Sequence, residues 1–186
     1  MTQYSDDYEA TPRSLKEIED LGASYLARAG LLAGDWIDPF EVMSELGFRD
    51  EVLSTRQMMG AHSFTNAKVN TISMTRQMRQ ALRNDDMGYR YIWAHEIGHL
   101  GMHRGPGLKA RVAGQFSNKS YNFIPRERSA EFQAWLFARA LFVPRHMLQN
   151  GIYEGLEYQL GIPLYAIEKR LDDIQADELG MLFRDR

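Results

Sequence analysis

Residues 93–99 read WAHEIGH and contain the pattern H-E-x-x-H in His95, Glu96 and His99. In a helix, residues i and i+4 lie one turn apart on the same face, so both imidazoles can reach one metal ion. Neutral imidazole is a common ligand of zinc. Glu96, beside the first histidine, can accept a proton from water on that ion and return it to a leaving amine. The stretch therefore predicts a helix that binds zinc through His95 and His99 and carries Glu96 as a general base.

The same helix is expected to be packed from behind. Its side opposite the two histidines carries an apolar stripe formed by Tyr89, Trp93, Ile97 and Leu100. Asp85 or Asp86 can cap its start, and Gly105-Pro106 ends it after about His103. A helix held in this way directs its ligands inward.

Two histidines do not complete the site, because a catalytic zinc ion usually takes three protein ligands and a water molecule. The chain contains no cysteine, so the third ligand must be His, Asp or Glu. His103 lies four residues after His99, but three imidazoles spaced in this way span about 12 Å of a straight helix, too far for one ion. We therefore expect a supporting role for His103, as a contact of a ligand or as a structural residue.

An acid on a following helix is the better candidate. Glu127 and Glu131 are the acids between residues 97 and 153. Glu131 precedes a strongly apolar run and needs a partner if it is buried, for which a cation is suitable. Glu127 stands between Arg126 and Arg128 and is typical of a paired surface residue. We predict Glu131 as the third ligand.

The remaining pattern predicts a mainly helical α+β protein with a small antiparallel sheet before the metal helix. Thr11-Pro12 and Asp38-Pro39 each indicate the start of a helix, residues 51–75 suggest short strands, and Pro125 opens a helix that ends before Pro144. We expect a single domain over residues 11–186 with a small C-terminal helical portion, and a disordered tail over residues 1–10.

Composition gives no general reason to expect nucleic acid or membrane as a partner. The net charge is −3, the hydrophobic fraction is 44% and no apolar run reaches the length of a membrane span. The absence of cysteine fits a reducing compartment, and we expect a cytoplasmic protein.

The order of motifs resembles the ImmA/IrrE family of metallopeptidases. In that family, an H-E-x-x-H helix, often with a further His four residues on, precedes a helix of the form E-x-x-A-x-x-F-A-x-x-L-x-x-P, which residues 131–144 match. By this resemblance, His95, His99 and Glu131 are metal ligands and Glu96 is the catalytic base. The family often has Asn or Asp where this chain has Trp135. Family members cleave helix-turn-helix repressors.

Three hypotheses about function follow. The first is a zinc-dependent endopeptidase, with one zinc ion per chain or another divalent metal such as Mn²⁺, that cuts a helix-turn-helix transcriptional repressor. The second is a non-catalytic, metal-binding anti-repressor that acts by binding its protein partner. The third is a DNA-binding module built on residues 160–171, which the acids that follow disfavour. Tyr121 and His146 are candidates to stabilise an oxyanion by residue type alone.

Overall fold

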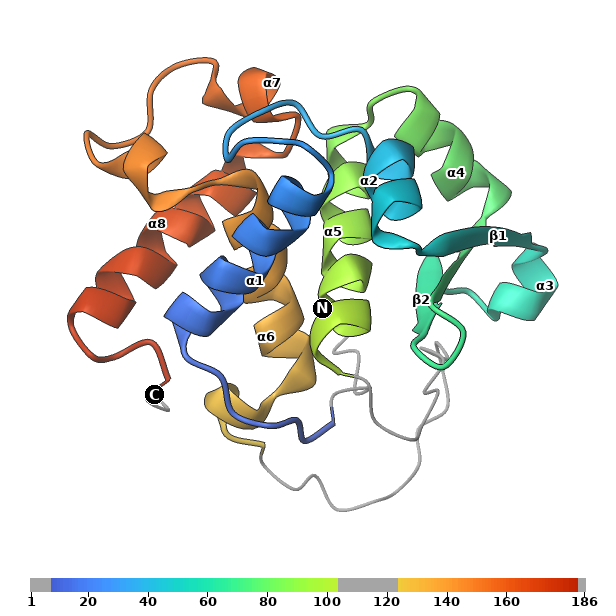
Figure 1. The fold of residues 1–186 in the computed structure, drawn as a ribbon, viewed down its shortest axis with the longest axis horizontal. Helices are drawn as coiled ribbons and strands as arrows, with labels where there is room; N and C mark the ends of the chain where they lie inside the picture. Colours follow the sequence, from blue (N-terminus) through green and yellow to red (C-terminus); the bar gives the residue numbers. More distant parts are fainter. Residues whose placement is uncertain (1–7, 104–123, 184–186) are drawn as a thin grey trace.

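The computed structural model describes residues 8–103 and 124–183, and within them the long helix α5 lies between a group of helices and a small sheet (Figure 1). The elements, in chain order, are α1 (Leu15–Arg28), α2 (Pro39–Leu46), β1 (Arg49–Leu53), α3 (Thr55–Met58), β2 (Ser63–Asn66), β3 (Thr71–Thr75), α4 (Arg76–Arg83), α5 (Met87–Met102), η1 (Arg126–Arg128), α6 (Ala130–Phe142), η2 (Arg145–Leu148), α7 (Leu156–Leu160) and α8 (Leu164–Glu178). The predicted class, a mainly helical α+β fold, is confirmed.

The start of α5 is fixed by Asp86, whose side chain accepts a hydrogen bond from the backbone N–H of Tyr89, as predicted. The predicted apolar side of α5 is buried at Trp93, Ile97 and Leu100. The histidine side is buried as well, because α6 packs against α5 and β2 also contacts it. Helix α5 is therefore enclosed by the core on both sides rather than covered on one side only.

Two other helix starts differ from the prediction. The first helix begins at Leu15 with Ser14 as its N-cap, in a capping box with Glu17, and not at Thr11-Pro12. The helix after Pro125 begins at Ala130, capped by Ser129, because the short helix η1 comes first. The start at Asp38-Pro39 is confirmed.

The sheet is mixed and not antiparallel as predicted. Its strand order is β1-β3-β2, with β1 parallel and β2 antiparallel to β3. The connection from β1 to β2 contains the short helix α3, and β2 does not pair with β1. Strand β3 follows β2 through a turn and lies between the two, antiparallel to β2 and parallel to β1. The edge strand β2 is the strand in closest contact with α5.

The N-terminal segment is tied to the start of α6. Glu9 and Ser129 form a β-bridge, and the backbone N–H of Ala10 donates to the Arg128 carbonyl. Residues 8–10 of the predicted tail are therefore paired with the start of α6 in the structure, while residues 1–7 lie outside the described part of the chain.

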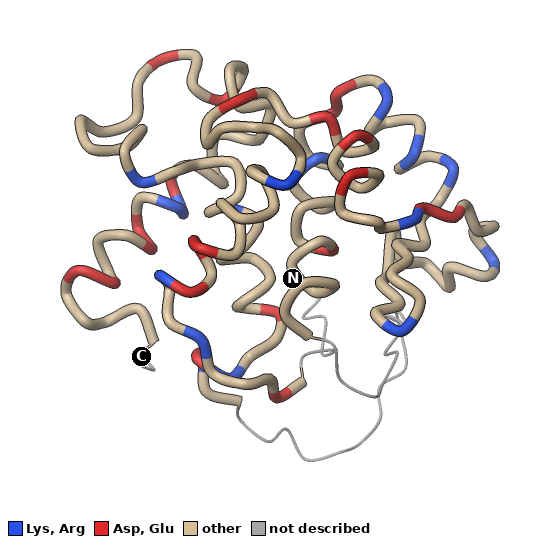
Figure 2. Tube along the Cα trace, in the orientation of Figure 1, with Lys and Arg blue, Asp and Glu red and all other residues tan. Residues whose placement is uncertain are grey.

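Helix α8 is joined to α5 and α6 by buried charges. The Arg139 guanidinium of α6 pairs with Asp173 of α8 and also donates to the Tyr91 hydroxyl of α5 at 3.2 Å. Basic and acidic residues are both spread over the described chain, but helix α4 carries arginines and no acid (Figure 2). In α8, Lys169 pairs with Asp172 and the buried Arg170 pairs with Glu19. No helix in the described ranges has the length and apolar character needed to cross a bilayer.

Candidate metal centre

A close contact between α5 and α6 positions the candidate ligands. Gly98 lies between His95 and His99, and a Cβ atom at Gly98 would lie 3.0 Å from Phe137 Cδ1 and 3.2 Å from the Ala134 carbonyl oxygen. Helices approach this closely only where a side chain is absent. The contact brings Glu131, in the first turn of α6, to the histidine face of α5.

His95, His99 and Glu131 form one cluster with the spacing of metal ligands. The Nε2 atoms of His95 and His99 are 3.0 Å apart, and the Glu131 carboxylate oxygens lie 3.4 Å from His95 Nε2 and 3.0 Å from His99 Nε2. Zinc–ligand bonds of about 2.0–2.1 Å in a tetrahedron place neighbouring donor atoms about 3.3 Å apart. Two imidazoles and one carboxylate at this spacing can hold a divalent cation and leave a fourth position for water or substrate.

The charge of the cluster suits a cation. Burial raises the pKa of the Glu131 carboxyl, but hydrogen bonds and charge interactions with His95 and His99 outweigh it and hold that pKa well below its usual range. Glu131 is therefore a carboxylate at neutral pH. His95 is fully buried and Glu131 is 23% exposed, so the site opens on the side of the carboxylate.

The other two candidates among the predicted residues lie outside the cluster. Glu127 belongs to η1, before the turn that begins α6, and does not join the two histidines. His103 caps the end of α5 and its Nδ1 lies 3.0 Å from His99 Nδ1, on the side of the His99 ring away from the cluster. Burial lowers the pKa of His103 to about 4, so its ring is neutral at pH 7.

Glu96 is held by a residue that the sequence did not point to. It is 2% exposed, and the Ser63 hydroxyl of β2 donates to its Oε1 atom at 2.9 Å. Ser63 lies 33 residues before Glu96 and in no motif, so only the packing of β2 against α5 reveals it. Because Oε1 accepts the hydrogen bond from Ser63, the other carboxylate oxygen of Glu96, Oε2, can accept a proton.

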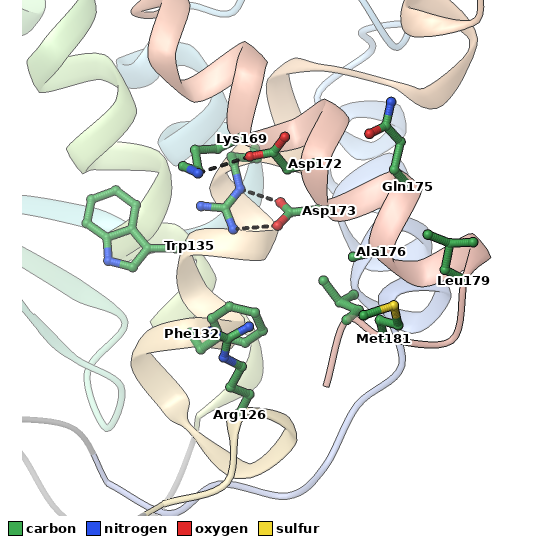
Figure 3. Close-up of a pocket in the computed structure, with 12 residues that line it drawn as sticks. Arg126, Phe132, Trp135, Lys169, Asp172, Asp173, Gln175, Ala176, Leu179 and Met181 are labelled. Atoms are coloured by element: carbon green, nitrogen blue, oxygen red, sulfur yellow. Dashed lines mark hydrogen bonds and ion pairs between the residues drawn. The ribbon is translucent and has the colours of Figure 1, made fainter. Parts of the chain in front are cut away.

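Aromatic rings pack against the histidines. The Trp135 ring lies 4.0 Å from the His95 ring between centroids, and the Tyr8 ring lies 6.4 Å from that of His99. Trp135 also lines a groove between α6 and α8, whose other wall carries Leu179 and Met181 (Figure 3). Trp135 therefore contacts the candidate ligand His95 and also lines the groove.

The remaining histidines and the suggested oxyanion residues are not at the cluster. The His62 ring packs edge-on against Tyr89, two turns before Glu96. His146 is exposed in η2, which follows the C-terminal end of α6. Glu131 lies near the other end of α6, about 16 Å from that C-terminal end at 1.5 Å per residue. Tyr121 lies outside the described residues.

The cluster joins residues 95–99 and Glu131, which lie in the two motifs, residues 95–103 and 131–144, that resemble the ImmA/IrrE family most strongly. Comparison of the whole chain with protein-family models, with curated proteins and with solved structures finds no match. The resemblance therefore rests on these motifs and, more weakly, on the N-terminal helix, the Asp38-Pro39 helix and the strand before α5.

Proposed function

We propose that the protein is a zinc-dependent endopeptidase. The observation that carries the proposal is the convergence of His95, His99 and Glu131 at the spacing of zinc ligands, with the buried carboxylate of Glu96 on the same helix. A site that only stabilised the fold would be expected to use four protein ligands, whereas this cluster offers three. Three ligands and an adjacent carboxylate are the features of a hydrolytic zinc site.

In the proposed hydrolysis, the three ligands hold the ion and Glu96 transfers a proton. A zinc ion held by His95, His99 and Glu131 would supply Lewis acidity: it would polarise the scissile carbonyl and lower the pKa of the attacking water, so that this water could lose a proton. Glu96 accepts the proton of that water at Oε2, while Ser63 holds Oε1 and fixes the plane of the carboxylate. Glu96 then returns the proton to the leaving amine. Because Glu96 is nearly excluded from bulk water, the transferred proton stays within the site.

The proposed substrate is a helix-turn-helix repressor, cut in an exposed linker. This part of the proposal is supported by the resemblance to the ImmA/IrrE family. An extended linker suits an endopeptidase, because the scissile bond must reach the open side of the cluster beside Glu131. The alternative is an anti-repressor that binds the same partner through its metal-supported fold without cutting it.

The test combines metal analysis with cleavage of a repressor encoded beside this gene. Purified protein is loaded with zinc, its metal content is measured by mass spectrometry, and repressor fragments are followed over time. We expect about one zinc ion per chain in the wild type, in Glu96→Gln and in the surface control Glu168→Gln. Cleavage should fall by about a hundred- to ten-thousand-fold in Glu96→Gln alone.

The outcomes separate the two functions. Stoichiometric metal with a loss of repressor function but no fragments from any variant would support the anti-repressor. Equal cleavage by wild type and Glu96→Gln would show that Glu96 is not the base. Full metal occupancy in a His95→Ala, His99→Ala double variant would overturn the metal site itself.

A further inference from the structure

His103 and Gln133 form a buried chain of hydrogen bonds behind the ligand His99. The two Nδ1 atoms of His99 and His103 are 3.0 Å apart, and His103 Nε2 lies 3.1 Å from the Gln133 Oε1 atom. Gln133 is fully buried, and His99 and His103 are 7% and 9% exposed. Few water molecules can therefore compete for these contacts.

The direction of the chain is set by Gln133. Its amide nitrogen donates to two backbone carbonyls, those of Thr11 at 3.0 Å and Glu127 at 2.7 Å. Carbonyl oxygens only accept, so the amide cannot be turned around without facing oxygen to oxygen. The Oε1 atom of Gln133 consequently faces His103 and accepts from it.

The remaining hydrogens follow from this orientation. His103 must carry its hydrogen on Nε2 to donate to Gln133, so the Nδ1 atom of its neutral ring can only accept. The short contact between the Nδ1 atoms is then satisfied by a hydrogen on His99 Nδ1. Without an ion, Nε2 of His99 contacts Glu131 through a hydrogen. A metal ion would replace that hydrogen, and with the other hydrogen kept on Nδ1 the lone pair of Nε2 would face the ion between His95 and Glu131.

We propose that His103 and Gln133 are positioning residues that hold His99 in the tautomer able to bind the metal ion. This inference rests on the proposed metal site and adds to it the residues that prepare one ligand. The opposite tautomer of His99 would place a hydrogen on Nε2, where the ion binds, and would set two lone pairs against each other at the Nδ1 contact. The Tyr8 ring lies 5.8 Å from the His103 ring and helps to enclose the pair.

The first test measures zinc affinity by competition with a chromogenic chelator, using the full chain. His103→Phe should bind zinc about 10- to 100-fold more weakly, the usual effect of removing a partner of a metal-bound histidine. His103→Asn can still accept from His99 Nδ1 and should recover part of this loss. Ser73→Ala, which removes a partly buried hydrogen bond from the Ser73 hydroxyl to Glu51 in the sheet, is the matched control and should bind zinc as the wild type does.

The second test reads the tautomers directly in the zinc-loaded wild type, from two-bond proton–nitrogen correlations of ¹⁵N-labelled histidines. We expect His99 to be protonated at Nδ1 and His103 at Nε2. A proton on His103 Nδ1, or zinc binding by His103→Phe as tight as in the wild type, overturns the inference but leaves the proposed site intact. Failure of the wild type to bind zinc overturns both.

Discussion

Substitution of Gly98 by alanine tests whether the spacing of the cluster depends on the contact between α5 and α6. The new methyl group would lie 3.0 Å from Phe137 Cδ1, whereas carbon atoms pack best at about 3.5–4.0 Å, so the helices must separate by about 0.5 Å or Phe137 must move. Such overpacking costs about 1–3 kcal/mol. The higher helix propensity of alanine offsets up to about 1 kcal/mol of this cost, so we expect the free energy of unfolding to fall by about 1 kcal/mol.

The same displacement should weaken metal binding. Metal–ligand distances in a well-formed site are held to within about 0.2 Å, so a shift of Glu131 by about 0.5 Å should lower zinc affinity by about 10- to 100-fold. Urea unfolding of the metal-free protein and chelator competition measure the two effects separately.

Gly22→Ala is the matched control, because Gly22 is also a buried helical glycine facing α6. Its nearest neighbour for a Cβ atom is Leu141 Cα at 3.6 Å, an ordinary contact. This variant should be as stable as the wild type or more stable, and should bind zinc normally. If Gly98→Ala matches Gly22→Ala in both measurements, the contact at Gly98 does not set the geometry of the site.

Three further outcomes are expected. Glu131→Gln should lower zinc affinity more than a hundredfold, which exceeds the usual effect of removing a residue that only contacts a ligand, whereas Glu127→Gln should leave the affinity nearly unchanged. The reverse order in a chelator titration would place the third ligand in η1. In the metal-free protein, burial lowers the pKa of His103 from 6.5 in the unfolded chain to about 4 in the folded protein. The unfolded chain therefore binds the proton more readily, so the contribution of neutral His103 to stability is present above pH 6.5 and is lost as the pH falls towards 4. Urea unfolding should show about 2 kcal/mol of this loss between pH 7 and 5, and His103→Phe should not show it. Arg139→Met leaves Asp173 buried without its cation and should destabilise the fold by about 3–5 kcal/mol in the same assay, while Lys169→Met, at an exposed ion pair, should change stability by less than about 1 kcal/mol.

The parts of the molecule that could be predicted from sequence are those set by nearby residues. The spacing of His95 and His99 needs only the helical repeat, and the cap at Asp86 needs only the first turn of α5. Glu131 could be chosen over Glu127 because the two acids have different neighbours in the chain. Each of these inferences depends on a few consecutive residues.

The parts that could not be predicted depend on contacts between distant segments. The parallel pairing of β1 with β3 depends on how the connection through α3 packs, and the alternation of apolar and polar residues in the strands gives no information about this packing. Ser63 and Gln133 are polar residues without a motif, and they reach Glu96 and His103 only after β2 and α6 have packed on α5. The order of residues 8–10 likewise comes from pairing with residues 128–130.

The enclosure of α5 by the core has a thermodynamic consequence for the proposed binding of a metal ion. The backbone that carries His95 and His99 is fixed by the burial of Trp93, Ile97 and Leu100, which does not involve an ion. Binding should therefore order few residues and bury little apolar surface, so its heat-capacity change should be small, in contrast to small zinc domains that fold only when they bind. The affinity is then set by dehydration of the ion and by the protons that the ligands release, and calorimetry in buffers of different ionisation enthalpy would count those protons.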